Sequence, residues 1–479
     1  SRRLCAGLGL RVLYLDQTPY GSALTDRANQ FIRQRCAELL AFRRANGFAE
    51  LGRLSGKLLG EIVPRRLGEL FESPDRLSDD WLFPRPTEVR PAWLQLERDL
   101  DRPVARLPLE PDLARDMARY LGDWQQGAFP PRGRAARALW DTLGDIDGLR
   151  PGNAETVREE SVQPAAGITS LGHAGLLFDD GTTRVLIDPY LPPRSSCYPA
   201  NRQPASVTNV GRPDAVLITH GHADHFDLNS LLRCGADTPI VVPYVARETV
   251  LAADMASRLR ELGFRAVHVM APGQQIVLGS VRVTALPFYG EQPAEDAVLH
   301  PEVRNTGLTY LVEMPAHRLL ALADTGRDPA GDVRDLARSV ALGGPVDTVF
   351  GPFRGTGIYP AQYVASALAR NLPFVPRWLW QTAQKQMCDI EDLLEVGSRC
   401  RARRVVPYAA GGEPCYWMRG VGRTPHVSRD DDPMQLEPLA EDVVKTADLR
   451  RRNASTPLVV PLRAGQRLAV AQPASPRPA

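Results

Sequence analysis

Three histidines and two aspartates stand close together in the run THGHADHFD, Thr219 to Asp227. The chain has 479 residues and only eight histidines, so this density indicates a metal site built from imidazole and carboxylate ligands. The run follows AVLIT, a candidate buried strand. Alternate residues of an extended segment share a face, so His220 and His222 point the same way. Asp224 and His225 come after the bend and face a second position. The run therefore predicts two adjacent metals.

This motif resembles the His-x-His-x-Asp-His signature of the metallo-β-lactamase fold superfamily. The resemblance spans roughly Ile168 to Tyr408, about half of the chain. It implies that Asp188, which ends the run VLIDP, orients the metal loop from behind. It also implies that Asp324, which ends the run LLALAD, is the carboxylate that bridges both metals.

Two positions depart from the hydrolases of that superfamily. The hydrolases carry a further histidine ligand between the first motif and the bridging aspartate, whereas here the strand VRVTALPF runs into YGEQ and places Glu291 there. Glu295 and Glu302 are the alternatives. The late histidine of a PxH turn is replaced by Ala409 in RRVVPYAAGG. His426 could take its place only along a different chain path.

The other histidines are weaker candidates. His268 lies inside the run AVHVM and is expected to be a core or edge histidine, and His300 and His317 lie in polar or loop contexts. His173 in GHAG stands either at the edge of the cluster or behind it, and we favour a role in supporting the ligands. The flanking glycines indicate a close approach of the backbone and not a phosphate loop.

The predicted ligands are His220, His222, Glu291 and Asp324 for one metal, and Asp224, His225 and Asp324 for the other. A carboxylate-rich mixed site with open positions suits iron that changes oxidation state, whereas zinc hydrolases favour more nitrogen ligands. Manganese and zinc also accept such a set, so the residue types alone leave the metal open.

A closer resemblance follows from the pattern GHAGLLF, LIDPYL, THGHADHFD, PFYGEQ and LADTG behind a largely helical N-terminal region. The pattern is similar to that of the diiron β-hydroxylases of natural-product biosynthesis, the chloramphenicol-pathway type, in which a glutamate replaces the usual histidine. The resemblance implies two iron ions, O₂ as co-substrate, and an external electron donor such as a reductase. It also implies a monooxygenase in which Glu291 and Asp324 act at the reaction centre. The implied substrate is a thioester on coenzyme A or on a carrier protein, hydroxylated at the β carbon. Arg354 in FGPFRGTGIYP is a candidate contact for phosphopantetheine or a carboxylate.

Two rival functions remain. The first is a dinuclear zinc or manganese hydrolase, such as a lactonase, phosphodiesterase or thioesterase, in which a metal lowers the pKa of its bound water to about 7. The second is a non-catalytic scaffold, which the intact ligand motif argues against.

Composition places limits on the cellular setting. A net charge of +2 gives no argument for nucleic-acid binding, and no run approaches the roughly 20 apolar residues of a membrane span. Seven scattered cysteines without a CxxC pair favour a reducing cytoplasm over a disulfide framework. The start SRRLCAGLGLRVLYL is expected to be a strand and not a leader.

The elements that position the motifs divide the chain into three predicted parts. Residues 1–160 form a mainly helical, α+β accessory domain for substrate docking or dimerisation, with helices at 25–47 and 112–127. Residues 161–415 form the catalytic domain, an α/β fold in which many short strands and a few helices (245–263, 333–342, 360–371 and 389–400) make a metallo-β-lactamase αββα sandwich. Residues 416–479 form an extension with one or two strands and a disordered tail.

Overall fold

The computed structural model describes most of the catalytic region and parts of both ends of the chain. The described residues are 2–4, 8–14, 71–73, 76–77, 92–98, 102–126, 133–151, 166–191, 210–222, 224–249, 252–292, 304–315, 317–353, 355, 387–409, 440–451 and 456–470. Statements about the structure refer to these residues.

Two seven-stranded sheets form the centre of the molecule. The first sheet has the order β13-β12-β11-β10-β9-β8-β23, in which β10 to β13 are parallel and the other pairs are antiparallel. Its strands are β8 (Gly167–Gly172), β9 (Gly175–Asp179), β10 (Arg184–Ile187), β11 (Ala215–Leu217), β12 (Ile240–Pro243), β13 (Val267–Met270) and β23 (Arg467–Ala469).

The second sheet repeats this division in the order β14-β15-β16-β17-β20-β21-β22. The strands β14 to β17 are antiparallel, and β17, β20, β21 and β22 are parallel. Their bounds are β14 (Gln275–Leu278), β15 (Val281–Pro287), β16 (Leu308–Met314), β17 (His317–Ala321), β20 (Thr348–Gly351), β21 (Arg404–Pro407) and β22 (Leu458–Val459). The short hairpin of β18 (Arg327–Asp328) and β19 (Gly331–Asp332) follows β17.

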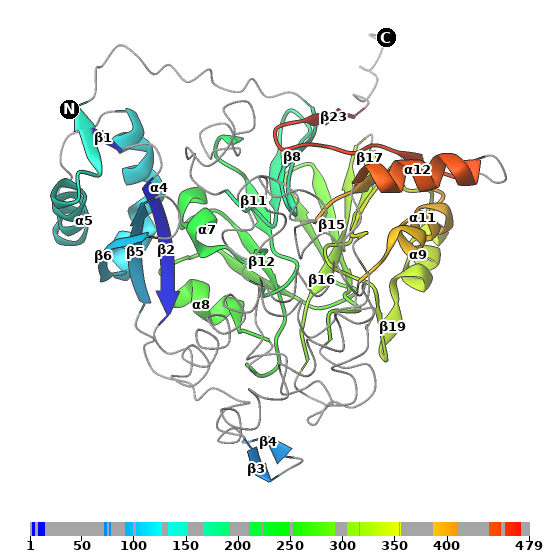
Figure 1. Cartoon of the computed structure of the whole chain (residues 1–479), viewed down its shortest axis with the longest axis horizontal. Coiled ribbons are helices and arrows are strands. Elements are labelled where there is room, and N and C mark those ends of the chain that lie inside the picture. The colour runs from blue at the N-terminus through cyan, green and yellow to red at the C-terminus, as the bar shows by residue number, and fades with distance from the viewer. Residues whose placement is uncertain are drawn as a thin grey trace, which may run out of the picture.

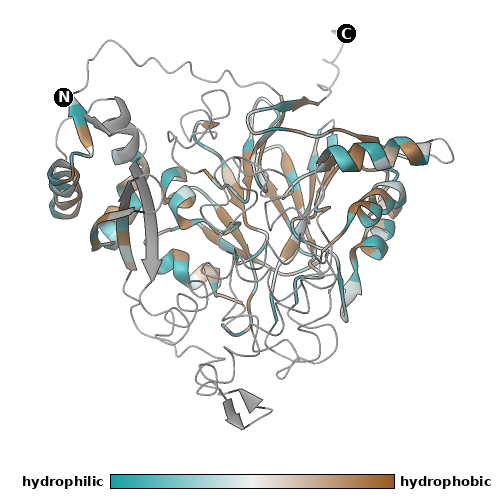
Figure 2. Cartoon of the chain, viewed as in Figure 1, coloured by the Kyte–Doolittle hydropathy of each residue, from teal (hydrophilic) through white to brown (hydrophobic). Residues whose placement is uncertain are grey.

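A shared core holds the two sheets together. Phe178 and Val241 of the first sheet pack in one buried cluster with Tyr310 and Phe350 of the second. Strands buried on both faces read as continuous apolar runs, and Figure 2 shows such apolar stretches along both sheets. Each fully buried side chain of this size contributes about 1.5–3 kcal/mol through the hydrophobic effect.

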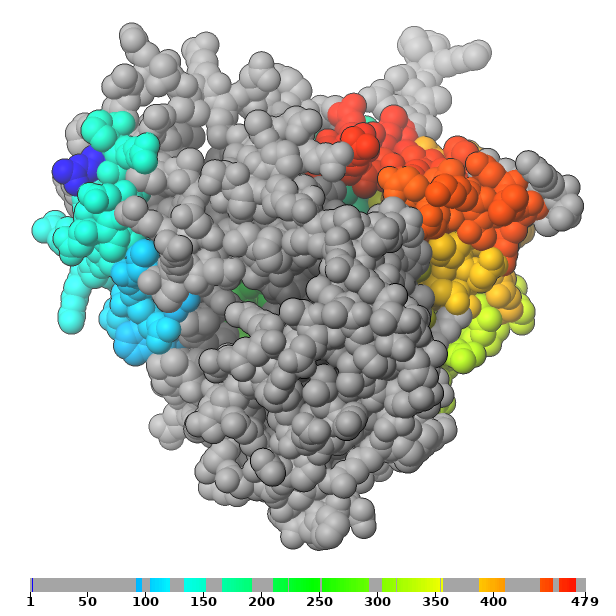
Figure 3. Space-filling view, viewed as in Figure 1, coloured from blue at the N-terminus to red at the C-terminus, as the bar shows by residue number. Residues whose placement is uncertain are grey.

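Helices cover the outer face of each sheet, which completes the expected αββα layering (Figure 1). The helices α7 (Leu228–Cys234) and α8 (Met255–Glu261) pack on the first sheet. The helices α9 (Val333–Leu342), α11 (Ile390–Arg399) and α12 (Ala440–Arg451) pack on the second. Figure 3 shows the described N-terminal and C-terminal elements on opposite flanks of the molecule.

The described N-terminal elements are α+β, with more strands than we expected. They comprise β1 (Arg2–Leu4) paired with β7 (Leu149–Pro151), β3 (Phe71–Ser73) paired with β4 (Arg76–Leu77), and a sheet of β2 (Leu8–Tyr14), β5 (Ala92–Arg98) and β6 (Arg102–Pro108). The helices are α4 (Pro111–Gln126), as predicted, and α5 (Arg134–Asp145). Leu94 of β5 and Met117 of α4 lie in the same buried cluster as Leu231 of α7, so this region packs on the first sheet's helical layer.

Most other predicted elements are present. All the strands expected between Ile168 and Gly351, the opening strand, and the helices at 333–342 and 389–400 are confirmed. The expected helix at 245–263 is too long, because Asp254 caps α8 by accepting from the Ser257 N–H. Before this cap, the backbones of Thr249 and Ala252 exchange hydrogen bonds that do not belong to a helix. The predicted helices at 25–47 and 360–371, the tail and both domain boundaries lie outside the described residues.

Two further observations bear on the composition-based expectations. The described cysteines Cys234, Cys388 and Cys400 are buried. Among the described residues, no helix combines the length and apolar character needed to cross a membrane.

Candidate metal centre

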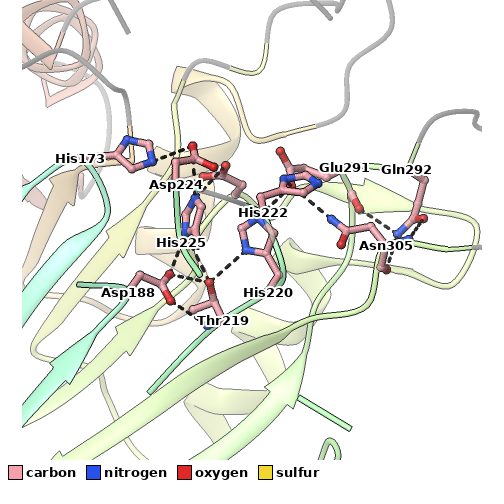
Figure 4. A network of polar contacts seen from close by, with 12 residues as sticks. His173, Asp188, Thr219, His220, His222, Asp224, His225, Glu291, Gln292 and Asn305 are labelled. Atoms are coloured by element: carbon pink, nitrogen blue, oxygen red, sulfur yellow. Dashed lines mark hydrogen bonds and ion pairs between the residues drawn. The ribbon is translucent and has the colours of Figure 1, made fainter. Parts of the chain in front are cut away.

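All the predicted ligands within the described residues meet at one end of the two sheets. The motif follows β11, Asp188 follows β10, and His173 lies in the turn between β8 and β9. Glu291 follows β15 and Asp324 follows β17, both in the second sheet. Figure 4 shows the side chains of the motif close to those of His173, Asp188 and Glu291. The site therefore lies across the sandwich, as loops at the ends of strands from both sheets can provide.

A first group of donor atoms comes from two histidines and the unusual glutamate. Oε2 of Glu291 lies 3.2 Å from Nε2 of His220 and 3.0 Å from Nδ1 of His222. All three side chains offer ligand atoms within 4.8 Å of one another. The side chain of His220 is fully buried, whereas that of His222 is 38% exposed. This group has an inner side and a side open to solvent.

A second group contains Asp224, His225 and His173. Oδ2 of Asp224 lies 3.0 Å from Nε2 of His173 and 3.9 Å from Nε2 of His225. His173, which we expected to support the ligands from behind, offers its own nitrogen at the same distances as the motif residues.

Asp324 lies between these groups. It forms a third cluster with His220 of the first group and His225 of the second, all within 4.8 Å, and its Oδ2 is 3.2 Å from Nε2 of His225. Its other oxygen, Oδ1, is buried and has no hydrogen-bond partner among the described residues. A buried carboxylate oxygen without a partner is costly unless a cation binds it. The donor set therefore fits bound cations, which Asp324 would hold together with the histidines of both groups.

Asp188 and Thr219 hold the histidines from behind. Oδ2 of Asp188 lies 2.7 Å from Nδ1 of His225 and also accepts the hydroxyl hydrogen of Thr219. The Thr219 oxygen in turn lies 3.0 Å from Nδ1 of His220. Both histidines thereby turn Nε2 toward the site, which is the usual way a protein fixes the tautomer of a metal ligand. This geometry agrees with the role that the family resemblance implied for Asp188.

A pair of amide side chains fixes Glu291. Asn305 donates from Nδ2 to Oε2 of Glu291 at 3.3 Å. The side chain of Gln292 holds the backbone of Asn305 in place. Its oxygen accepts from the backbone N–H of Asn305 at 3.0 Å, and its nitrogen donates to the backbone carbonyl of Asn305 at 3.0 Å. Gln292 also donates to the carbonyl of Gly290, whose N–H donates to Asp328. The glutamate is therefore positioned by neighbours on both sides.

The backbone is strained around the site. Among the described residues seven non-glycine positions have positive φ, and five of them lie here: His173 (47°), Asp188 (41°), Glu291 (49°), Ala323 (53°) and Ala409 (57°). Each such residue costs on the order of 1–3 kcal/mol, which the surrounding packing must offset. Strain gathered at a single site indicates that function, and not stability, set these conformations.

The electrostatics of the clustered side chains favour a cation. Burial acts against a charge on His225, but Asp324, Asp188 and Asp224 outweigh it and raise its pKa well above the usual value. Burial likewise acts against a charge on Glu291, yet His222 and His220 hold its pKa well below the usual value. By contrast, burial and the neighbouring His225 lower the pKa of His220. The carboxylates thus favour positive charge beside His225, and a bound cation would supply that charge.

The remaining sequence candidates lie away from this cluster or outside the described residues. His268 is exposed on the edge strand β13, as expected. His317 is not in a loop, because it begins β17 and is buried against Thr348. Arg354, Glu295, His300, Glu302 and His426 lie outside the described residues.

Sequence reasoning missed the positioning residues Thr219, Gln292, Asn305 and Tyr408. Thr219 and Gln292 directly adjoin ligands, and that adjacency was the available signal. The Tyr408 oxygen accepts from the Ala323 N–H at 2.6 Å, which holds the strained residue before Asp324.

Comparison with known proteins supports this fold and site. Residues 183–408 match the β-lactamase superfamily domain. The chain is 29% identical over 184 residues to a UPF0173 protein of Pyrococcus furiosus, covering 38% of this chain and 68% of that protein. It is 30% identical over 184 residues to the 4-amino-L-phenylalanyl-[CmlP-peptidyl-carrier-protein] 3-hydroxylase of Streptomyces venezuelae, covering 38% of this chain but only 32% of that enzyme.

Solved structures extend the likeness to the whole chain. CmlA, a diiron β-hydroxylase from Streptomyces venezuelae, superposes with a TM-score of 0.58 at 19% identity over 98% of this chain and 99% of that one. A variant of the same β-hydroxylase gives 0.61 at 17% identity over 98% and 100%. At this identity the likeness concerns the fold. The chain thus has a metallo-β-lactamase fold, residues 183–408 are similar to the β-lactamase superfamily domain, and the resemblance to diiron β-hydroxylases is supported.

Proposed function

We propose that the protein is an O₂-dependent nonheme diiron monooxygenase that hydroxylates a carbon β to the carbonyl of a thioester-linked substrate. The observation that carries the proposal is the placement of Glu291. Its carboxylate contacts both His220 and His222 at 3.0–3.2 Å, where the hydrolases of this fold have a histidine. An additional anionic oxygen ligand favours iron in its higher oxidation state.

The bound irons would supply the redox chemistry, in which one oxygen atom of O₂ enters a C–H bond and the other leaves as water with two external electrons and two protons. The protein residues supply geometry. Asp188 and Thr219 orient His225 and His220, and Asn305 holds one oxygen of Glu291. Such outer contacts set ligand orientation and metal affinity.

We further propose that the substrate approaches on the side of His222 and Asp224. Their side chains are 38% and 25% exposed, whereas those of His220, His225 and His173 are 0–1% exposed. The buried side excludes water behind the cluster, so the exposed side is the face that a target carbon can reach.

The substrate class rests on the relatives. The hydroxylase relative is named for an aminoacyl group on a peptidyl carrier protein. We propose a thioester of coenzyme A or of a carrier protein for this chain, with an electron-donating reductase as a second partner. The N-terminal region, which packs on α7 and belongs to the fold shared with CmlA, is the proposed docking or dimerisation surface.

The decisive test combines metal content with an oxygen-tracing assay. Protein purified from iron-supplemented cells should hold two irons per chain. Supplied with a chemical reductant, ¹⁸O₂ and a panel of acyl-coenzyme A and aminoacyl-phosphopantetheine thioesters, it should yield a product heavier by one ¹⁸O atom, with the thioester intact. Stoichiometric zinc, no O₂ consumption and hydrolysis of the panel would contradict the proposal.

The hydrolase is the second candidate because the match to a UPF0173 protein covers more of that relative than the match to the hydroxylase does. A UPF0173 metal-dependent hydrolase of Deinococcus radiodurans is 41% identical over 76 residues, but these cover only 30% of that protein. In the experiment above, the hydrolase predicts free acid as product, with solvent oxygen in the new carboxylate.

A further inference from the structure

The second metal position has only one nitrogen ligand if only the motif residues are counted. The first position draws on His220 and His222, together with Glu291. The motif gives the second position His225 as its single imidazole, with the carboxylate of Asp224. Asp324 lies against both positions. The two positions would therefore be unequal in donor number, and the second would be underfilled.

The geometry points to His173 as the missing nitrogen ligand of the second metal. Its Nε2 lies 3.0 Å from Oδ2 of Asp224, and its donor atom and those of Asp224 and His225 lie within 4.8 Å of one another. With His173 included, each metal position has two imidazoles, one carboxylate of its own and a share of Asp324. The inference concerns metal binding, and it holds whichever metal and whichever reaction the site supports.

The turn that carries His173 is built to deliver its side chain to the site. His173 and Ala174 form a two-residue connection between Gly172 of β8 and Gly175 of β9, which pair with each other. His173 adopts a positive φ of 47°, and its side chain is 1% exposed. Its ring meets that of His225 edge-on, with centroids 5.1 Å apart. A strained, buried imidazole that faces a carboxylate and a second imidazole has the position expected of a metal ligand.

His173 also lies beside the position where the hydrolases' late histidine is absent. The backbone N–H of Ala409 donates to the carbonyl of His173 at 3.1 Å. Ala409 is buried and its methyl group cannot bind a metal. The two residues come from different sheets and touch at the rim of the second position, so a histidine on one side of this contact can replace a histidine lost on the other.

The alternative is that His173 only orients Asp224 through a hydrogen bond, and the substitution His173→Gln separates the two roles. Glutamine keeps an N–H donor for Asp224 but is a poor metal ligand. The probe is Fe(II) added anaerobically to the full-length metal-free protein, read by calorimetry and by metal analysis after desalting. The matched control is His268→Gln, the same substitution on the exposed edge strand β13.

We expect the unaltered protein and His268→Gln to retain two irons, and His173→Gln to retain one, with the second binding event weakened at least roughly tenfold. In His173→Gly, added imidazole should restore the second binding event. Paramagnetically shifted imidazole N–H resonances of the Co(II)-loaded protein should number one fewer in His173→Gln. Two irons bound with unchanged affinity and an unchanged set of these resonances in His173→Gln would overturn the inference. This outcome would leave the proposed oxygenase reaction untouched, because no turnover is measured.

Discussion

Asp188 Oδ2 lies 2.7 Å from Nδ1 of His225 and accepts the hydroxyl hydrogen of Thr219, whose oxygen faces Nδ1 of His220 at 3.0 Å. One buried carboxylate thus orients one histidine of each proposed metal position. The two proposed positions would be coupled from behind by this carboxylate as well as in front by Asp324.

Replacing Asp188 by asparagine should therefore weaken the binding of both metals and not of just one. The amide is neutral and offers one acceptor atom, so His225 and Thr219 lose their shared charged partner. We expect a drop of roughly 10–100-fold in affinity at each position. Competition with a chromophoric chelator measures both steps. Thr219→Val is the contrasting variant, and we expect it to lower the metal affinity of the His220 position alone. If Asp188→Asn weakened only one step, the coupling would be disproved.

Substituting Glu291 by histidine should convert the donor set toward that of a zinc hydrolase. We expect the variant to accumulate zinc in place of iron and to lose oxygenation, because an anionic oxygen ligand is exchanged for a neutral nitrogen. Metal analysis after growth with equal iron and zinc gives the ratio. Glu291→Gln removes the charge without adding an imidazole and serves as the comparison. Full hydroxylation by Glu291→His would show that another residue is the ligand.

Removing the side-chain amide of Asn305 should make the Glu291 carboxylate more mobile while leaving Glu291 itself in place. Asn305 Nδ2 donates to the same oxygen that faces His220 and His222, so Asn305→Ala frees this carboxylate to rotate. We expect roughly tenfold weaker binding of one of the two metals, measured by calorimetry. Asn229→Ala, in which the amide removed contacts Asp227 at the start of α7, is the control. Equal affinity in both variants would mean that Gln292 and Asn305 only shape the loop.

Tyr408→Phe should destabilise the fold near the bridging carboxylate. Its hydroxyl oxygen accepts from the Ala323 N–H at 2.6 Å, and both residues are buried. The variant leaves a buried N–H without a partner, which costs about 1–3 kcal/mol. Urea unfolding of the metal-free protein gives the change in the free energy of unfolding. Tyr244→Phe, at an exposed tyrosine, should be close to neutral. A Tyr408→Phe protein as stable as that control would contradict the prediction.

His317 should make stability fall in mild acid. Burial lowers its pKa to about 4, assisted by Arg404 and Arg403 and opposed by Asp347. An unfolded histidine has a pKa near 6.5, so between these values the unfolded chain binds the extra proton. The stability that neutral His317 contributes is therefore complete above about pH 6.5 and is lost as the pH falls toward 4. Urea unfolding at several pH values should show a shallower acid loss for His317→Gln. Parallel curves would exclude His317 as the cause.

Local patterns in the sequence were sufficient for the strands and the ligand loops. Each core strand is a short apolar run with turn residues at both ends. The runs that end in His220 and Asp324 lead directly to candidate ligands, and the run that ends in Asp188 leads to the residue that orients His225. The same logic failed for α7, whose seven residues are too few to show a helical period. It also failed for β5 and β6, which are stabilised by pairing with each other and with β2.

The contacts that support the ligands could largely not be predicted from the sequence. Asn305 reaches Glu291 across a 14-residue separation that no periodicity encodes. His173 could be singled out by type and by its glycine neighbours, but whether its nitrogen faces Asp224 depends on how β8 and β11 are placed in the sheet.

The strands β22 and β23 have a consequence for the order of events during synthesis. They are separated by only a few residues, yet β22 extends the second sheet beside β21 and β23 extends the first beside β8, the strand that leads to His173. The second sheet has its outer strand once residue 459 has been made, and the first sheet only once residue 469 has been made. Because synthesis runs from the N-terminus, β23 is the last of the described strands to be made, and the sheet that carries His173 is completed after the other one.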